Sequence, residues 1–245
     1  MTDAHPTLEA DGIDHDYGTV SVLEDVSATV PRGAVTALIG PNGSGKTTLI
    51  RALAGLHEPT GGTITYHGPE TARRIGYLPQ HPAFRPGFTC RETLRFYASL
   101  VGAGDSAAMK HLDRVGLVDA ADRPVEALSG GMTRLLGIAQ ATIGDPPVVV
   151  LDEPGSGLDP GMSAHVFDVA ADLADDGIAV LLSSHDLELV ERVADQVLVL
   201  SDGQIVQRGS TTALEARYGV DSLWSVYENA IGGDLDTVRV QGGHA

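Results

Sequence analysis

The chain has 245 residues, of which 42% are hydrophobic, so it can bury a substantial core. Its 33 acidic residues outnumber 16 lysines and arginines, and a formal net charge of −17 excludes nucleic acid as an expected partner. A single cysteine, Cys90, excludes an intramolecular disulfide. No apolar run approaches the roughly 18–20 residues of a membrane helix. The acidic, polar start of the chain lacks a signal-peptide pattern, so we expect it to stay inside the cell.

Lysine is scarce, because Lys46 and Lys110 are the only two in the sequence. An acidic, lysine-poor composition resembles that of cytoplasmic proteins from salt-loving microbes. In such proteins carboxylate repulsion is screened, since the Debye length falls to about 3 Å at 1 M salt. The composition therefore predicts a halophilic protein, with an ordinary acidic protein as the alternative.

The first 80 residues predict antiparallel strands followed by the start of an α/β core. From Thr7 to Val30 the pattern is short and alternating, which favours antiparallel strands. Ala34–Ile39 is a continuous apolar run of strand length that leads through a glycine-rich turn into a helix ending at Gly55. Two further short strands are expected at Thr63–Tyr66 and Arg74–Leu78.

The pattern changes after Gln80, where a proline-rich loop precedes three predicted helices at residues 92–101, 106–115 and 129–143. The α/β alternation then resumes with strands at 148–152, 178–183 and 197–200 and helices at 161–174 and 186–193. Residues beyond about 220 are weakly patterned, and we assign them no element. The order predicts a parallel-sheet core with a helical insertion.

The segment from Gly40 to Thr48 reads GPNGSGKTT, which fits G-x-x-x-x-G-K-[ST] between a predicted strand and a predicted helix. Glycines let the backbone curl so that N–H groups point at phosphate oxygens, and the helix N-terminus adds its positive dipole end. Lys46 can reach the β- and γ-phosphates, and Thr47 can bind Mg²⁺. The alternative is a glycine-rich connecting turn. The predicted phosphate-binding residues are Gly40, Pro41, Asn42, Gly43, Ser44, Gly45, Lys46, Thr47 and Thr48.

The segment from Val148 to Pro154 reads VVVLDEP, an apolar strand followed by two carboxylates. The strand delivers Asp152 to the carboxyl edge of the sheet, where it can hold Mg²⁺ or its waters. Glu153 follows on the other side of the pleat and can orient the attacking water or accept its proton. Alone, the segment could equally be a strand with an acidic turn; together with the phosphate loop it predicts a nucleotide hydrolase.

The segment LSGGM, Leu128 to Met132, places Ser129, Gly130 and Gly131 at the start of a predicted helix. The exposed amides and the hydroxyl of such a start can bind an anion, although an ordinary N-cap is the alternative. The chain thus has two candidate phosphate-binding helix starts but only one lysine-bearing loop. This indicates a site shared between two copies of the chain.

In this order the motifs resemble the ATP-binding cassette family over about residues 7 to 217. The resemblance implies that Tyr17 stacks on adenine and that Gln80, in YLPQ, senses Mg²⁺ and the helical lobe. It also implies that Asp159, in SGLD, lies in the loop that crosses to a partner subunit. His185, in SSHD, would contact the γ-phosphate. In isolation each residue has a structural alternative, such as a strand, loop, turn or capping side chain.

The resemblance implies an α/β fold with a P-loop NTPase (RecA-like) core, an N-terminal antiparallel β subdomain and an inserted α-helical signature subdomain. The ATP-binding domain would span residues 1–220, with the helical insertion at about 81–143, and residues 221–245 would form a tail of unknown role. The cofactors would be ATP and Mg²⁺. Catalytic residues would be Glu153, His185 and Gln80, and metal-binding residues Thr47, Gln80 and Asp152.

The implied partners are a second copy of the chain and a separate transmembrane permease. Two copies would pair head to tail, with ATP between Lys46 of one copy and Ser129 of the other. The permease would attach the chain to the cytoplasmic face of the cell membrane. The segment from Phe84 to Phe96 is the expected docking surface, with packing inside the helical lobe as the alternative.

Some positions depart from the family pattern. Met132 stands where Gln is commonest, Arg134 and Leu135 stand where Gln-Arg often follows, and Gly155 stands where Thr is usual. These departures put in question fine details of the signature helix, which is the predicted helix that begins at LSGGM. They do not affect the prediction of ATP binding.

The transported substrate is scarcely encoded in the sequence. The chain looks like an exporter-type cassette, similar to the cassette subunit of the nitrous-oxide-reductase maturation system for copper or sulfur delivery, and also to cassettes of drug and polysaccharide exporters. A non-transport ATPase of iron–sulfur cluster assembly is the alternative function. A DNA-repair ATPase would need a long coiled-coil insertion, and translation factors usually carry two cassettes.

Overall fold

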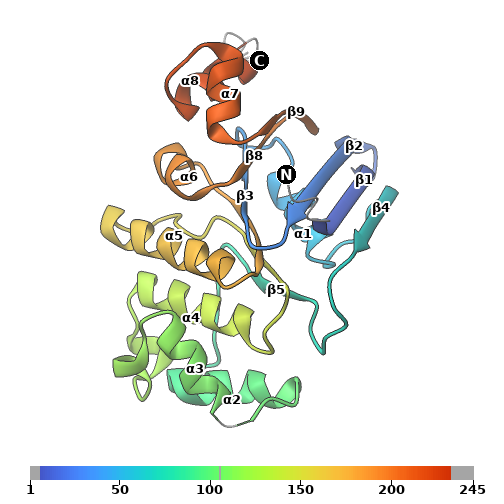
Figure 1. Ribbon diagram of the computed structural model, residues 1–245. Helices are drawn as coiled ribbons and strands as arrows, with labels where there is room; N and C mark the ends of the chain where they lie inside the picture. Colours follow the sequence, from blue (N-terminus) through green and yellow to red (C-terminus); the bar gives the residue numbers. More distant parts are fainter. Residues whose placement is uncertain (1–5, 105, 233–245) are drawn as a thin grey trace, which may run out of the picture.

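The computed structural model describes residues 6–104 and 106–232, which form two β-sheets and several helices, with the antiparallel sheet at one edge of the molecule (Figure 1). The smaller sheet is antiparallel and has the strand order β2-β1-β4. Its strands are β1 (Pro6–Tyr17), β2 (Val20–Pro31) and β4 (Gly61–Tyr66). The expected N-terminal antiparallel subdomain is therefore confirmed.

The larger sheet has six strands in the order β5-β6-β7-β3-β8-β9. They are β3 (Val35–Ile39), β5 (Ile75–Leu78), β6 (Val148–Leu151), β7 (Ala179–Ser183), β8 (Gln196–Ser201) and β9 (Gln204–Gly209). The first five strands in this order are parallel, and only β9 runs antiparallel to its neighbour. Continuous apolar runs suit these strands because both faces of a parallel sheet are covered.

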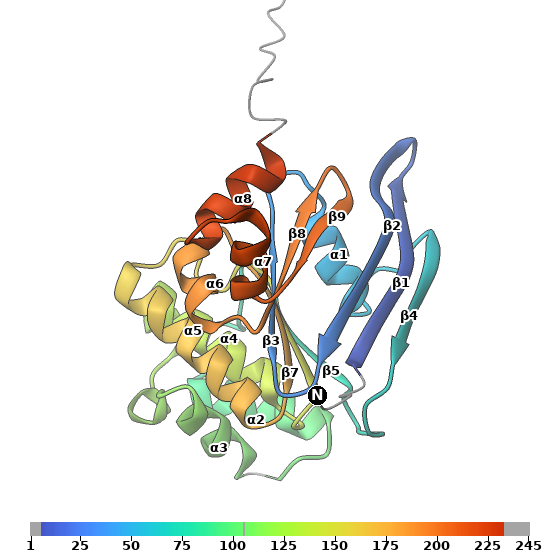
Figure 2. The same cartoon turned by 45° about the horizontal axis from the view of Figure 1, so that its top comes forward.

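Alternate residues of the central strand β3 pack on opposite faces of the sheet, because side chains in a strand alternate. Val35, Ala37 and Ile39 join the core shared with the helices, whereas Leu38 joins the core beneath helix α1 (Lys46–Leu53) and the antiparallel sheet. Figure 2 shows this arrangement, with α1 between the central strands and β1-β2-β4. The phosphate loop therefore begins at the end of a strand that is fixed from both sides.

The helical insertion lies between β5 and β6 in the chain and forms the lower part of Figure 1. It contains α2 (Cys90–Leu100), α3 (Ala107–Arg114), two short 3₁₀ turns (Val118–Ala120 and Val125–Ala127) and α4 (Gly130–Thr142). A capping box between Thr89 and Glu92 starts α2. Two further helices, α5 (Pro160–Asp175) and α6 (Leu187–Val193), pack against each other beside the large sheet.

The sequence pattern assigned no element beyond about residue 220, but the structure contains one there. Helix α7 (Thr211–Tyr218) is followed by α8 (Leu223–Ile231), which starts at the N-cap Ser222. The buried residues of α8 are few, namely Leu223, Val226 and Ile231, so its apolar stripe is too short to stand out in sequence. Within the described ranges no helix is long and apolar enough to cross a membrane.

Candidate nucleotide-binding site

The phosphate loop connects β3 to α1, and its glycines are required by its shape. Gly43 and Gly45 have φ angles of 83° and 103°, in the left-handed region that favours glycine. At Gly40, an added Cβ atom would lie 2.1 Å from the carbonyl oxygen of Leu200, which belongs to the neighbouring strand β8. The loop can therefore curl tightly at the end of the sheet only with these residues.

Lys46 is the first residue of α1, and its side chain folds back over the loop. It is 7% exposed, and Nζ donates hydrogen bonds to the carbonyl oxygens of Gly40 at 2.8 Å and Pro41 at 3.0 Å. Burial lowers the pKa of Lys46, while the carboxylates of Glu153 and Asp152 oppose this shift. The ammonium group thus lies over the glycine loop, and among the described residues its hydrogen-bond partners are these two carbonyls, which phosphate oxygens could replace.

Asp152 and Glu153 follow β6 and are held by the neighbouring strand. Asp152 is 1% exposed, and its carboxylate accepts hydrogen bonds from the hydroxyls of Ser183 at 3.0 Å and Tyr77 at 3.4 Å. Glu153 is 7% exposed and has a φ angle of 49°, which is uncommon for a residue other than glycine. Strain of this kind persists only where the surroundings hold the backbone in place.

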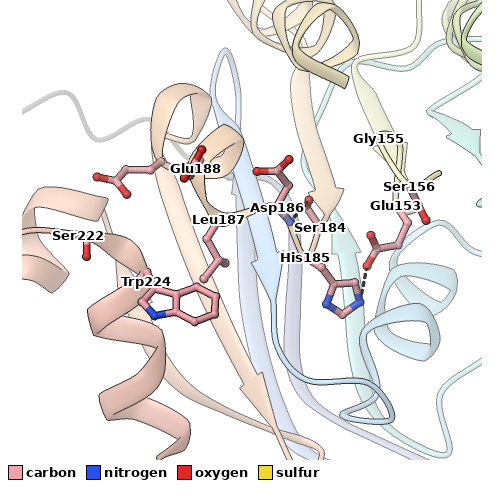
Figure 3. A pocket seen from close by; sticks show the side chains of 11 residues that line it. Glu153, Gly155, Ser156, Ser184, His185, Asp186, Leu187, Glu188, Ser222 and Trp224 are labelled. Atoms are coloured by element: carbon pink, nitrogen blue, oxygen red, sulfur yellow. Dashed lines mark hydrogen bonds and ion pairs between the residues drawn. The ribbon is translucent and has the colours of Figure 1, made fainter. Parts of the chain in front are cut away.

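The carboxylate of Glu153 faces His185, which follows β7 (Figure 3). Nε2 of His185 lies 3.0 Å from Oε1 of Glu153. Burial raises the pKa of Glu153, and the Asp152 carboxylate adds to this, whereas Lys46 opposes it. Burial lowers the pKa of His185, as does Lys46. The pair therefore combines a carboxylate that is more basic than usual with a histidine that tends to be neutral, a combination suited to moving or orienting a proton.

A cavity of about 310 Å³ brings the separate motifs together. It is lined by the phosphate loop, the start of α1 and residues from four other parts of the chain: Val22, Asn42, Gly43, Gly45, Lys46, Thr47, Thr48, Gln80, Glu153 and His185. A larger cavity of about 630 Å³ shares Glu153 and His185 but is otherwise lined by α6, α8 and neighbouring loops, with Trp224 on its wall (Figure 3). The larger cavity contains no phosphate-loop residue, so we place the phosphates in the smaller one.

Comparison with known proteins agrees with this geometry. Residues 23–156 match the family model described as ABC transporter. The lantibiotic transport ATP-binding protein SrtF of Streptococcus pyogenes is 33% identical, over 91% of this chain and 97% of its own. The chain belongs to the ABC transporter family. The Nod factor export ATP-binding protein I of Ralstonia nicotianae is 35% identical to this cassette, over 83% of this chain and 67% of its own.

Solved structures give the same result for the fold. The structure of an ATP-binding subunit of an ABC transporter superposes with a TM-score of 0.81 at 30% identity, covering 91% of this cassette and 99% of that chain. A dimeric ATP-binding cassette bound to ADP and phosphate has the same fold, with a TM-score of 0.74 at 21% identity over 83% and 98% of the two chains. This cassette is therefore an ATP-binding subunit of an ABC transporter with an ATPase domain, and the expected α/β fold is confirmed.

Several of the predicted site residues do not line the phosphate cavity. Ser129 is the N-cap of α4 and accepts a hydrogen bond from the N–H of Met132 at 3.2 Å, with Gly130 and Gly131 behind it. Asp159 caps α5 in the same way, accepting from Met162 at 3.0 Å. Within one chain these residues are helix caps, and a role at the phosphates would require a second copy.

Tyr17 lies at the end of β1, also outside the phosphate cavity. Its side chain is 49% exposed, so one face is available for stacking. The hydroxyl lies 3.3 Å from Nδ1 of His57, and the ring packs edge-on against His15 at a centroid distance of 4.8 Å. His15 and His57 thus orient the ring of Tyr17. In the sequence, only the family resemblance had indicated a role for this residue.

Two residues that touch the site were missed by sequence reasoning. Ser183 contacts both Asp152 and Glu153, but this follows only from the pairing of Leu151 with Leu182 in neighbouring strands. Arg134 was noted only as a departure from the family pattern, and its side chain reaches two loops of the site. In the sequence, the only sign of either role was a polar residue in an apolar segment: Ser183 in a strand and Arg134 in a helix.

Proposed function

We propose that this cassette hydrolyses ATP with Mg²⁺ in the cavity above the phosphate loop and thereby powers a separate membrane permease. One observation carries the proposal: Lys46, Gln80, Glu153 and His185, from four distant parts of the sequence, line one cavity. In this site the loop amides and Lys46 would bind the β- and γ-phosphates. His185 would lie on the γ-phosphate side, next to Glu153.

The residues that would hold Mg²⁺ are Thr47, Gln80 and Asp152. The donor set fits, because hydroxyl, amide and carboxylate oxygens are the ligands that Mg²⁺ prefers. Among the described residues the hydrogen-bond partners of the Asp152 carboxylate are two hydroxyls, so its negative charge is not paired with a cationic side chain. A bound Mg²⁺ ion would supply neutralisation of phosphate charge.

Glu153 would orient the attacking water or accept its proton. Its raised pKa makes the ionised carboxylate a stronger base than an ordinary glutamate, and its backbone is held by Ser183. Most of the rate enhancement would come from positioning and charge neutralisation, as is general for phosphoryl transfer. His185, at 3.0 Å, would keep the carboxylate directed at the γ-phosphate side.

The complete site would contain two copies of the cassette. Ser129 and Gly130 are accessible at the N-terminal end of α4 but do not line the cavity of their own chain. A second copy placed head to tail would bring its own Ser129 to the γ-phosphate bound by Lys46, and Asp159 to the boundary between the copies. The dimer bound to ADP and phosphate, which shares this fold, supports such pairing.

The permease would be an exporter, and it would hold the cassette at the cytoplasmic face of the cell membrane. The relatives reported above are named for lantibiotic transport and Nod factor export, which favours export over the alternative of iron–sulfur cluster assembly. The nitrous-oxide-reductase maturation system remains one candidate among exporter-type systems. The segment 84–96 is the proposed docking surface, and Phe96 is 49% exposed there.

The proposal is tested with Glu153→Gln. The amide keeps the size of the side chain but cannot accept the proton, so turnover should fall by at least about a hundredfold while ATP binding is retained. By light scattering, this variant should be a dimer with ATP and a monomer without it. Lys46→Ala is the contrasting variant and should lose ATP affinity itself. Near-normal turnover in Glu153→Gln would contradict the role of Glu153, and an unchanged mass on adding ATP would contradict the shared site.

A further inference from the structure

Arg134 is a buried arginine on α4 whose guanidinium N–H groups donate hydrogen bonds to the loops of the nucleotide site. It lies in the second turn of the helix and is 6% exposed. One guanidinium nitrogen, Nη1, donates hydrogen bonds to the carbonyl oxygens of Gln80 and, at 3.4 Å, of Glu153. The other, Nη2, donates to the carbonyl oxygen of Ser156 at 3.1 Å. Gln80 lies in the loop after β5, and Glu153 and Ser156 lie together in the loop after β6, so two loops are attached to one side chain of one helix.

A charged side chain at this position needs a physical reason. The neighbouring positions of α4 are filled by buried apolar residues such as Leu135 and Leu136, and burying a guanidinium is costly unless its donors are satisfied. Burial lowers the pKa of Arg134, while Asp152 and Glu153 oppose that shift from a distance. Among the described residues no carboxylate lies within ion-pair distance of it, so its direct partners are loop carbonyls.

The carbonyl of Glu153 is the most informative of these partners. Glu153 has the left-handed φ angle of 49°, a strained conformation for a non-glycine residue. Its N–H donates to the Ser183 hydroxyl at 2.9 Å, and its C=O accepts from the backbone N–H of Ser156 at 3.2 Å and from Arg134 at 3.4 Å. Both peptide groups of the strained residue are therefore held, the N–H by strand β7 and the C=O by its own loop together with helix α4.

We propose that Arg134 is a positioning residue that couples the signature helix α4 to the hydrolysis site. The inference rests on the role proposed for Glu153. The same helix begins with Ser129 and Gly130, which would face the nucleotide of a second copy. A shift of α4 on pairing would move Arg134. Arg134 would then carry with it the loop of Gln80 and the loop that holds both Glu153 and Ser156. Hydrolysis-competent geometry at Glu153 would then depend on where the helical lobe lies.

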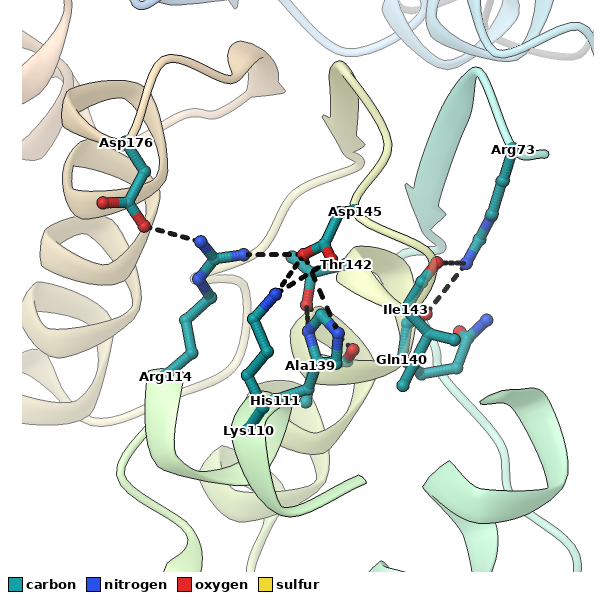
Figure 4. Close-up of polar contacts among 10 residues, drawn as sticks. All are labelled: Arg73, Lys110, His111, Arg114, Ala139, Gln140, Thr142, Ile143, Asp145 and Asp176. Carbon is teal, nitrogen blue, oxygen red and sulfur yellow. Dashed lines mark hydrogen bonds and ion pairs between the residues drawn. The ribbon is translucent and has the colours of Figure 1, made fainter. Parts of the chain in front are cut away.

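The chain offers a matched control in Arg73, which binds the other end of the same helix (Figure 4). Its Nη1 donates to the carbonyl oxygens of Gln140 at 2.9 Å and Ile143 at 3.3 Å, and burial lowers its pKa too. These carbonyls lie at the C-terminal end of α4, away from the nucleotide-site loops. Arg73→Lys therefore removes the same kind of contact from the same helix without touching the site.

The experiment compares Arg134→Lys with Arg73→Lys in the full chain. Lysine keeps the charge but cannot reproduce the two-pronged guanidinium contact. For Arg134→Lys we expect kcat to fall at least about tenfold with KM for ATP changed less than about threefold, because a displacement of about 1 Å can cost up to 10²-fold. For Arg73→Lys we expect kcat within about twofold of the wild type. Both variants should lower the melting temperature, so a merely structural role would affect them alike.

The outcomes separate this inference from the proposed function. Equal kcat in the two lysine variants, with Glu153→Gln inactive, would overturn the role of Arg134 and leave that of Glu153 standing. Near-normal turnover in Glu153→Gln would instead overturn the proposed function. If Arg134→Lys does not fold, Arg134→Gln is measured in the same way, since it keeps an N–H donor without the charge. The same tenfold fall in kcat at nearly constant KM supports the inference, and kcat equal to that of Arg73→Lys overturns it.

Discussion

The hydroxyl of Ser183 donates a hydrogen bond to Oδ1 of Asp152 at 3.0 Å, and it accepts one from the backbone N–H of Glu153 at 2.9 Å. Ser183 is fully buried at the end of β7, and Asp152 is 1% exposed. A single hydroxyl thus links the proposed metal ligand to the proposed catalytic base. Its loss would leave two buried polar groups unsatisfied.

We predict that Ser183→Ala lowers the free energy of unfolding by about 2–6 kcal/mol, because each of the two unsatisfied buried groups costs about 1–3 kcal/mol. The Mg²⁺ concentration for half-maximal ATPase activity should also rise several-fold, since Asp152 loses the hydroxyl that orients it. Urea denaturation and a Mg²⁺ titration after EDTA treatment measure the two effects.

A buried serine whose hydroxyl is hydrogen-bonded to neither carboxylate serves as the control. Ser163 is 6% exposed and donates to the carbonyl oxygen of Gly155 at 3.1 Å. Ser163→Ala should lower stability while leaving the Mg²⁺ requirement unchanged. An identical Mg²⁺ requirement in both variants would show that the Ser183 hydroxyl does not orient Asp152.

A second prediction concerns His111, which is buried in the helical insertion (Figure 4). The side chain is 2% exposed, and Nδ1 lies 2.8 Å from the hydroxyl of Thr142. Burial lowers the pKa of His111 to about 4, with Lys110 and Arg114 adding to the shift and Asp145 opposing it. The folded protein therefore keeps this imidazole neutral at pH values where the unfolded chain protonates it.

The sign of the pH effect follows from these values. Above about pH 6.5 both states are neutral at this site and the contribution of His111 is fully present. As the pH falls from about 6.5 to about 4, only the unfolded chain takes up the proton, so stability is lost. The loss should reach about 2–3 kcal/mol, at about 1.4 kcal/mol for each pH unit in this window.

The measurement is urea denaturation of the wild type and of His111→Gln at pH 7, 5.5 and 4.5. The glutamine variant cannot titrate, so the stability of the wild type relative to it should decrease as the pH falls. Parallel curves for the two proteins would mean that His111 titrates at an ordinary pKa in the folded state.

The third prediction concerns salt. The 33 acidic residues face only 16 lysines and arginines, and pairs such as Lys110–Asp145 and Arg74–Glu70 are well exposed. Exposed pairs contribute only about 0–1 kcal/mol, so repulsion among the unpaired carboxylates should dominate the response to salt. We predict that the melting temperature and the ATPase rate both rise between about 0.1 M and 2 M KCl.

An uncharged osmolyte at matched osmolality is the control, since it does not screen charge. A melting temperature that is flat or falls with KCl would remove the halophilic interpretation. An equal rise in melting temperature with the osmolyte would also remove that interpretation. The ATPase assignment would be unaffected, because it depends on the phosphate loop and on Glu153.

The sequence alone determined the features whose causes are local. The apolar run of β3 predicted a buried strand because a parallel sheet is covered on both faces, and its residues do pack in two separate cores. The phosphate loop was predictable because the curl at Gly43 and Gly45 requires left-handed glycines. The helix start at Ser129 was predictable because an N-cap binds an amide three residues along the chain.

Only the tertiary structure decided which distant residues meet. Ser183 reaches Asp152 because β6 and β7 are neighbours with Leu151 opposite Leu182, a pairing that the two apolar strands do not encode individually. Arg134 reaches Gln80 and Ser156 across 54 and 22 residues of sequence. It can do so because α4 packs against β5 and β6, the two strands after which these loops begin. Local propensity and spacing act over a few residues, whereas these contacts depend on strand order and helix packing, which the whole core determines.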